Sequence, residues 1–226
     1  VTDYIEHDLD WEAQELKLLE RHVQSAPSRH VRLGIVDLET SLFVGVAPKD
    51  AAELRRSIRA SSAIPLFFAP VAPSLVDGGV RNIAPVRLAF DLAAEVLKGQ
   101  PGVYDGVRIF VALAAPLAVA SEPGPWAERA VLDIGKRSLS IMESENYEWD
   151  VKGAQRFNWL VKFFSEHPEL EPPPFVKGRL YADIVVIQPE REYYGSLTFD
   201  PALIRAYWRH GYERTQKALA DLGVGG

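Results

Sequence analysis

An aspartate followed by two glycines, Asp77-Gly78-Gly79, is the part of this sequence whose residue types and spacing best suit chemistry. The acid comes directly after the apolar pair Leu75-Val76, so we expect it at the end of a buried strand. Folds that alternate strands and helices place their sites at such strand ends, and glycines allow close approach of backbone or ligand. An aspartate here is either a turn-former or part of a reactive site, and Asp-Gly alone favours the turn.

The elements that must position this motif alternate between strands and helices. Apolar runs bounded by turn residues predict strands over residues 31–36, 41–46, 107–112 and 181–187, and a strand end just before Asp77. Helical spacing and capping residues predict helices over residues 10–24, 49–61, 84–97, 126–143, 151–165 and 201–222. This alternation favours an α/β fold in which helices cover a sheet.

Two segments bear on how the elements are organised. Residues 107–112 read V-R-I-F-V-A, a run typical of a strand that is covered on both faces. Residues 171–175 read E-P-P-P-F and predict a stiff connector, but a single strand and a helix follow it. Because those two elements are too few for an independent domain, we expect one domain over residues 1–226.

Composition excludes several classes of protein. With 47% hydrophobic and 25% charged residues the 226-residue chain is typical of a soluble globular protein, with the cytoplasm slightly favoured. A net charge of -6 gives no basic patch for nucleic acid and no polybasic attraction to a membrane. The absence of cysteine excludes disulfides and thiol chemistry. The longest apolar run, 109–120, is shorter than the about 20 residues that a membrane-spanning helix needs.

The residues around the Asp-Gly-Gly carry a resemblance to a known family. A-S-S-A-I-P stands at residues 60–65 before the motif, and N-I-A-P stands at residues 82–85 after it. This order resembles the patatin-like phospholipase family, in which A-S-x-A-x-P precedes D-G-G or D-G-A and an N-x-P stretch follows. The N-I-A-P segment departs from that pattern by one extra residue before the proline. The resemblance is closest over residues 59–86 and extends loosely over residues 31–222.

The resemblance implies a fold, a mechanism and a substrate class. The fold would be patatin-like, a three-layer helix-sheet-helix arrangement that is incomplete at its N-terminal side in this chain. The activity would be hydrolysis of lipid acyl esters by a Ser-Asp dyad, with Asp77 as general base and with Gly78 and Gly79 shaping its loop. No metal ion or organic cofactor is required by that chemistry. Peripheral contact with a lipid surface is compatible with such a substrate.

Two parts of such a site are missing from the sequence. No glycine is followed two positions later by serine, so the G-x-S-x-G nucleophile elbow is absent. A Gly-rich oxyanion loop is absent as well, and the chain begins with Val1. We expect the serine on an N-terminal segment or a partner chain, so that this chain alone hydrolyses nothing. The alternative is a non-catalytic binding or assembly protein built on the same scaffold.

Phe67 and Phe68 precede the motif in an apolar, proline-rich segment. Two aromatic rings beside a catalytic carboxylate would suit an acyl-chain pocket, because lipid tails bind in apolar clefts with few polar groups. The alternative is ordinary core packing, which we expect for at least one of the two rings.

Other groups carry weaker signals. Ser61 and Ser62 end a predicted helix, where serine usually bonds to backbone, so neither is expected to be a nucleophile. Residues 6–10 (E-H-D-L-D) lack the spacing of a calcium or zinc site. Residues 207–212 (Y-W-R-H-G-Y) are expected to pack an aromatic face against the sheet. The histidines, which form no metal-binding pair, are His7, His22, His30, His167 and His210.

Overall fold

The computed structural model describes residues 17, 21, 30–65, 67–71, 73–99, 102, 104–117, 121–190 and 200–224. Contacts divide the chain into two compact units, residues 1–88 and 89–226, and each is described by itself. The single domain expected over residues 1–226 stays a prediction, because two such units can belong to one domain. The helix predicted over residues 10–24 lies outside the described residues, apart from Lys17 and Arg21.

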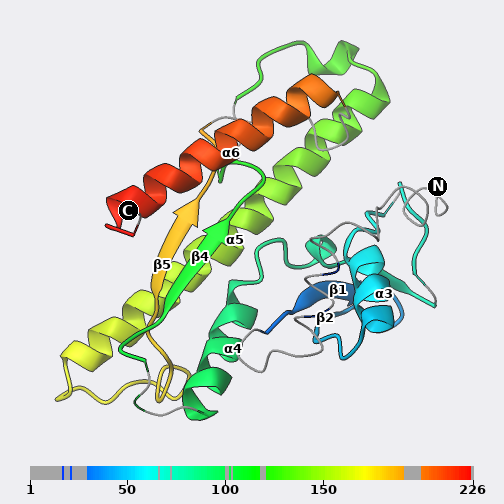
Figure 1. Ribbon diagram of the computed structural model, residues 1–226. Coiled ribbons are helices and arrows are strands. Elements are labelled where there is room, and N and C mark those ends of the chain that lie inside the picture. Colours follow the sequence, from blue (N-terminus) through cyan, green and yellow to red (C-terminus); the bar gives the residue numbers. More distant parts are fainter. Residues whose placement is uncertain are drawn as a thin grey trace. The chain divides into compact units, whose positions relative to one another are not determined.

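The first unit contains a three-stranded antiparallel sheet in the order β2-β1-β3 (Figure 1). Strands β1 (Leu33–Asp37) and β2 (Leu42–Val46) form a hairpin, which confirms the two strands predicted on either side of a turn. Strand β3 (Leu75–Asp77) pairs with the other edge of β1, and its register places Asp77 opposite Ile35. The central strand of this sheet therefore holds the end of β3 and with it the Asp-Gly-Gly motif.

Helix α3 (Ala51–Ser61) covers this sheet and confirms the helix predicted over residues 49–61. Its first turn is closed by a reciprocal cap: Asp50 Oδ1 accepts from the Glu53 amide at 2.8 Å, and Glu53 Oε2 accepts from the Lys49 amide at 2.8 Å. The helix contacts β1 and β3. The apolar core of the unit consists of buried side chains from these elements and the segments beside them: Ile35, Val36, Leu54, Ala60, Ala63, Val76, Ala84 and Val86.

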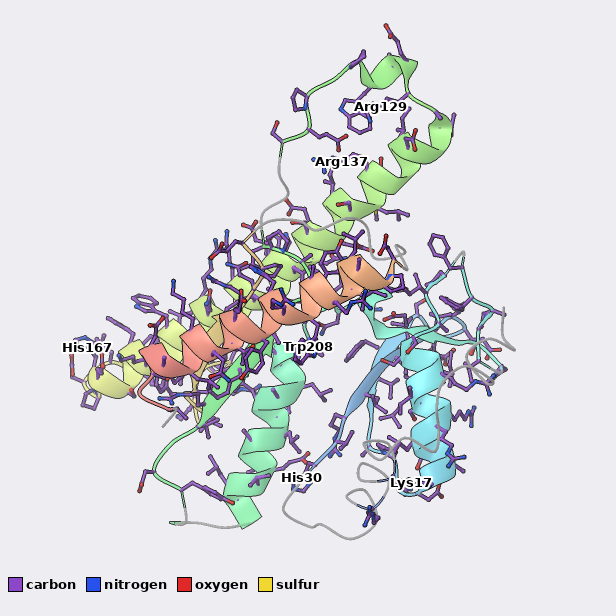
Figure 2. The ribbon with its side chains drawn as sticks, turned by 45° about the horizontal axis from the view of Figure 1, so that its top comes forward. Lys17, His30, Arg129, Arg137, His167 and Trp208 are labelled. Atoms are coloured by element: carbon purple, nitrogen blue, oxygen red, sulfur yellow. The ribbon has the colours of Figure 1, made fainter. Side chains whose placement is uncertain are left out.

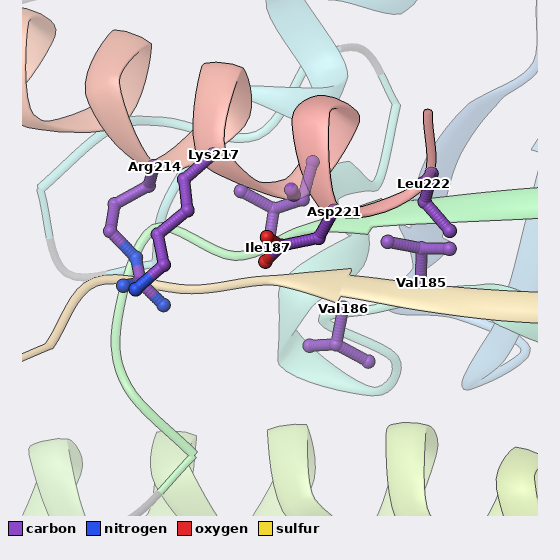
Figure 3. A pocket seen from close by; sticks show the side chains of 8 residues that line it. Val185, Val186, Ile187, Arg214, Lys217, Asp221 and Leu222 are labelled. Atoms are coloured by element: carbon purple, nitrogen blue, oxygen red, sulfur yellow. The ribbon is translucent and has the colours of Figure 1, made fainter. Parts of the chain in front are cut away.

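Helix α4 (Val86–Gly99) follows Pro85, as the sequence predicted, since proline is favoured in the first turn of a helix. The second unit then continues through β4 (Arg108–Ala112), α5 (Val131–Glu166), β5 (Asp183–Ile187) and α6 (Pro201–Asp221). Strands β4 and β5 are parallel neighbours, and β5 lies between α6 and α5 (Figure 3). A helix that connects two parallel strands makes a βαβ unit.

The structure corrects the sequence reading at α5. Residues 126–143 and 151–165 were expected to form two helices, but residues 131–166 form one continuous helix of 36 residues. The preceding residues Trp126–Glu128 form a separate 3-10 turn. The predicted gap, residues 144–150, contains no proline and no glycine, so nothing in the backbone chemistry interrupts the helix there.

A second correction concerns β4. Along this strand Ile109 and Val111 are each 8% exposed, whereas Phe110 is 45% exposed. On the open face Arg108 Nε donates to Asp183 Oδ2 of the neighbouring strand at 2.8 Å. Among the described residues one face of β4 is therefore covered and the other is open, so the prediction of a strand covered on both faces is wrong.

A buried amide joins α5 to the start of β5. Asn158 is 7% exposed, its Nδ2 donates to the Ala182 carbonyl at 2.6 Å, and its Oδ1 accepts from the Ala182 amide at 3.0 Å. Both hydrogen-bonding groups of a buried peptide are thus satisfied by one side chain, which holds β5 against the helix.

The architecture is mixed α/β, as the alternation of elements predicted. The described strands form two small sheets, one antiparallel and one parallel, rather than the single sheet expected from the sequence. Across the part of the chain that the structure describes, no helix is both long enough and apolar enough to cross a bilayer.

Candidate functional site

Asp77 ends strand β3 and at the same time begins a short 3-10 helix, η1 (Gly78–Val80). Its backbone amide donates to the Ala63 carbonyl at 3.1 Å, and its side chain turns forward to accept from the Gly79 amide at 2.7 Å through Oδ1. The second hydrogen bond is that of an N-cap, in which a carboxylate accepts from an otherwise unpaired amide. The strand end and the cap together fix the position of the carboxylate.

The two glycines have different roles. Gly78 is buried, and a Cβ atom on it would lie 2.6 Å from both the carbonyl carbon and the oxygen of Gly34. This close approach of the η1 backbone to strand β1 excludes a side chain at residue 78. Gly79 supplies the amide that binds Asp77, and a Cβ atom there would lie 3.1 Å from Asp77 Oδ1. The motif therefore combines a tight backbone packing contact with a bound carboxylate.

The environment of Asp77 changes its acidity. Partial burial raises the pKa of the Asp77 carboxyl above its ordinary value, and the hydrogen bond from the Gly79 amide opposes that effect. Among the described residues no donor reaches Oδ2 of this carboxylate. A carboxylate with a raised pKa and one oxygen still able to accept is chemically suited to take a proton from a hydroxyl group.

A second carboxylate, Asp37, lies on the same pair of strands, at the end of β1 opposite Leu75. Its Oδ1 accepts from Ser74 Oγ at 2.6 Å and from the Glu39 amide at 3.0 Å, and its Oδ2 accepts from Thr40 Oγ1 at 3.1 Å. The bond from Ser74 is the main reason why the pKa of Asp37 lies below its ordinary value. Asp37 thus closes a turn with both oxygens already bonded.

Half of the signal for this cluster is local. Residues 37–40 read D-L-E-T, and an aspartate that bonds to the residues just after it is typical of turns. The donor from Ser74, which stands 37 positions later, has no local sequence signal. Of the two carboxylates on these strands, Asp77 keeps the chemistry of a base, since Asp37 has a lowered pKa and bonds on both oxygens.

Phe67 and Phe68 lie in the turn that follows α3, and both of their amides donate to the Ile64 carbonyl, at 3.2 and 3.0 Å. The neighbouring carbonyl of Ala63 is the one that accepts from Asp77. The segment that leads to Phe67 therefore begins at a backbone contact with Asp77. Phe67 is 41% exposed and Phe68 is partly buried, so one ring is open to solvent. Their role as an acyl-chain pocket stays a prediction.

The helix-end serine Ser62 behaves as expected for a structural residue. Ser62 Oγ donates to the Ile58 carbonyl at 2.9 Å, so the hydroxyl is used in capping α3. Ser61 is the last residue of the same helix. A serine nucleophile needs an adjacent general base to activate its hydroxyl, and a backbone carbonyl is not such a base.

The histidines and the acidic N-terminal segment give no metal site in the described part of the chain, where no group of three potential ligands converges. Residues 6–10, His7 and His22 lie outside the described residues. His167 ends α5, where its ring lies 4.6 Å from that of Phe163 and its Nδ1 lies 3.1 Å from Glu169 Oε1 (Figure 2). His167 therefore interacts with the aromatic ring and the carboxylate next to it at the end of α5.

The aromatic segment at residues 207–212 differs from its prediction. Trp208 projects from α6 and is 72% exposed, and its ring stacks on that of Tyr212 with centroids 5.7 Å apart (Figure 2). Tyr212 is 55% exposed. The expectation that an aromatic face packs against the sheet is therefore wrong for these two residues, which pack on each other along the helix surface.

No protein-family model matches the chain, and no curated protein matches its sequence. The resemblance to patatin-like phospholipases therefore rests on the short segments at residues 60–65, 77–79 and 82–85. The choice of Asp77 as the candidate site rests on its hydrogen bonds and burial.

Proposed function

We propose that this chain is the aspartate-bearing part of a patatin-like lipid acyl hydrolase in which Asp77 is the general base. The observation that carries the proposal is the contrast between Asp77 and Asp37. The former has a raised pKa and an oxygen that no described donor reaches, whereas the latter has a lowered pKa and bonds on both oxygens. The motif match at residues 60–85 supports the same residue.

The proposed reaction uses Asp77 as a proton carrier. A serine hydroxyl within reach of Asp77 Oδ2 gives up its proton to the carboxylate while its oxygen attacks the ester carbonyl. The proton then passes to the departing alcohol, which leaves an acyl-serine, and water hydrolyses that acyl-serine to the free acid. Backbone amides must stabilise the negative oxygen that forms at each attack.

The serine and the oxyanion amides must come from outside this sequence, because it contains no G-x-S-x-G. We place them on an N-terminal segment or on a partner chain. The tight contact between Gly78 and Gly34 supports a role in holding Asp77 rigidly for such an approach, since catalytic groups require fixed positions.

The three-layer patatin-like arrangement is part of this proposal. Its support is the parallel pair β4 and β5, of which β5 lies between helices α5 and α6 (Figure 3). Parallel strands connected through helices are typical of α/β folds.

The test uses the complete gene product together with any chain that co-purifies with it. A fluorophosphonate probe should label one serine, and a p-nitrophenyl acyl ester should be hydrolysed. Asp77→Asn should remove this turnover while leaving the fold intact, because the Asn amide oxygen still accepts from Gly79. Asp37→Asn, a matched change on the same pair of strands, should keep turnover near the wild-type rate. Wild-type turnover in the Asp77→Asn protein would refute the base assignment.

The second candidate function is a non-catalytic binding or assembly protein on this scaffold. One observation favours it: Asp77 already caps η1, so the Asp-Gly-Gly motif has a structural role without catalysis. A folded complete gene product that takes no probe on any serine and hydrolyses no ester would support this function over the first.

A further inference from the structure

A cavity of about 240 Å³ lies between β5 and α6, within the second unit. One side of it is apolar and is lined by Val185, Ile187 and Leu222, and the other side carries charged residues of α6 (Figure 3). The charged residues that line the cavity are Arg214, Lys217 and Asp221.

The local geometry explains this two-sided character. Alternate residues of a strand point to the same face, so Val185 and Ile187 lie on the α6 side of β5, while Val186 points the other way (Figure 3). On the helix, residues spaced by three and four share one face. Lys217 and Asp221 therefore lie on the same side of α6, above the apolar strand.

The charges in the cavity are not equally engaged. Arg214 Nη1 forms an ion pair with Glu190 Oε1 at 2.7 Å, and Arg214 Nε donates to the Gln188 carbonyl at 3.2 Å. The positive charge of Arg214 is therefore already paired with a carboxylate. Neither Lys217 nor Asp221 forms an ion pair with a residue that the structure describes, even though the two are four positions apart on one helix. Among the described residues, one positive and one negative group that line the cavity, both on solvent-exposed residues, therefore have no ion-pair partner.

From this arrangement we propose that the cavity between β5 and α6 binds a small zwitterion with an apolar body, of the class of the apolar α-amino acids. The ligand's carboxylate pairs with Lys217, its ammonium group pairs with Asp221, and its side chain lies against Val185 and Ile187. A simple carboxylate would meet the negative charge of Asp221, and a simple amine would meet the positive charge of Lys217. A ligand with both charges avoids both repulsions.

The size of the cavity agrees with this class. The cavity has a volume of about 240 Å³ and is partly open to solvent. This volume is below the roughly 300 to 1,000 Å³ of sites for drug-sized ligands. The proposal goes beyond the hydrolase function, and none of its residues belongs to the unit that holds Asp77.

The test is isothermal titration calorimetry of the full chain with L-leucine and its two single-charge analogues. 4-Methylpentanoate lacks the ammonium group, and 3-methylbutylamine lacks the carboxylate. We expect leucine to bind with a Kd of about 1 mM or lower, and each analogue to bind at least about fivefold more weakly.

Two substitutions should each reduce the preference for leucine over one of its single-charge analogues. Lys217→Gln should weaken leucine binding about fivefold and reduce the discrimination against the amine, whereas Asp221→Asn should weaken leucine similarly and reduce the discrimination against the carboxylate. Glu213→Gln is the matched control, because Glu213 lies on the same helix but does not line the cavity. The Glu213→Gln variant should bind leucine with the same affinity as the wild type.

Either of two outcomes would overturn the proposal. One is the absence of any heat of binding with leucine up to about 50 mM, a concentration well above the expected Kd. The other is tighter or equal binding of 4-methylpentanoate by the wild-type chain, which would show that the negative charge of Asp221 is not sensed.

Discussion

The contact between Gly78 and Gly34 makes a sharp prediction about stability. Gly78→Ala would place a Cβ atom 2.6 Å from the carbonyl carbon and oxygen of Gly34. Both obstructing atoms belong to the backbone of β1, the central strand of its sheet. No rotation of a side chain can relieve the clash, so the strands themselves must move apart.

The magnitude follows from the distance. Restoring a carbon–carbon contact of about 3.5 Å requires a displacement of about 0.9 Å between the two backbones. The hydrogen bonds between β1 and β3 cannot absorb such a shift without lengthening, and overpacking of this kind typically costs about 1 to 3 kcal/mol. We therefore expect the free energy of unfolding of the first unit to fall by about 2 kcal/mol.

Hydrogen exchange measured by mass spectrometry gives the required local readout. A loss of about 2 kcal/mol should speed exchange of the most protected amides of β1 and β3 by about thirtyfold. At the described positions the tryptophans all belong to the second unit: Trp126, Trp149, Trp159 and Trp208.

The matched control is Gly211→Ala in α6, where a Cβ atom would meet nothing within 4 Å. Alanine is favoured over glycine inside a helix by about 1 kcal/mol, so this variant should be as stable as the wild type or more stable. Unchanged exchange in β1 and β3 of the Gly78→Ala protein would refute the close-packing explanation of the motif.

Two further predictions concern a charge and a buried amide. Because burial raises the folded-state pKa of Asp77, ionisation of this carboxyl destabilises the folded chain as the pH rises from about 3.9 through that raised pKa. Asp77→Asn should therefore gain stability relative to the wild type in urea unfolding at pH 7 but not at pH 3.5, and an equal difference at both pH values would contradict this sign. Asn158→Ala should lower the free energy of unfolding of the second unit by about 2 to 3 kcal/mol, because both polar groups of Ala182 lose their partner. Urea unfolding followed by tryptophan fluorescence checks this value, and a loss under about 0.5 kcal/mol would rule out the role given to Asn158.

Local signals explain which elements could be predicted. The β1–β2 hairpin, α3 and α6 all begin or end close to the predicted residues. The Asp50 and Asp200 side chains cap α3 and α6, since each accepts amides within the next three residues. Caps and turns involve neighbours in sequence, so they can be read without knowing the fold.

The predictions that were wrong concern features that depend on residues far apart in the sequence. Whether β4 is covered on one face or two depends on elements far away in the sequence, and its apolar run does not encode that. The exposure of Trp208 likewise depends on which face of α6 meets the strand. Helix α5 is one continuous helix where two were predicted, and no residue between the two predicted helices is a helix breaker.

For the candidate site, the sequence by itself determined the motif: an aspartate after an apolar strand, two glycines and the flanking segments that resemble one family. Only the tertiary structure decided what each residue does there. It placed Gly78 against Gly34, bound Ser74 to Asp37 and left Asp77 partly buried with one carboxylate oxygen that no described donor reaches. The physical reason is that backbone contact, burial and hydrogen bonding between distant residues exist only once the strands have paired, and these interactions set the pKa values of the two carboxylates.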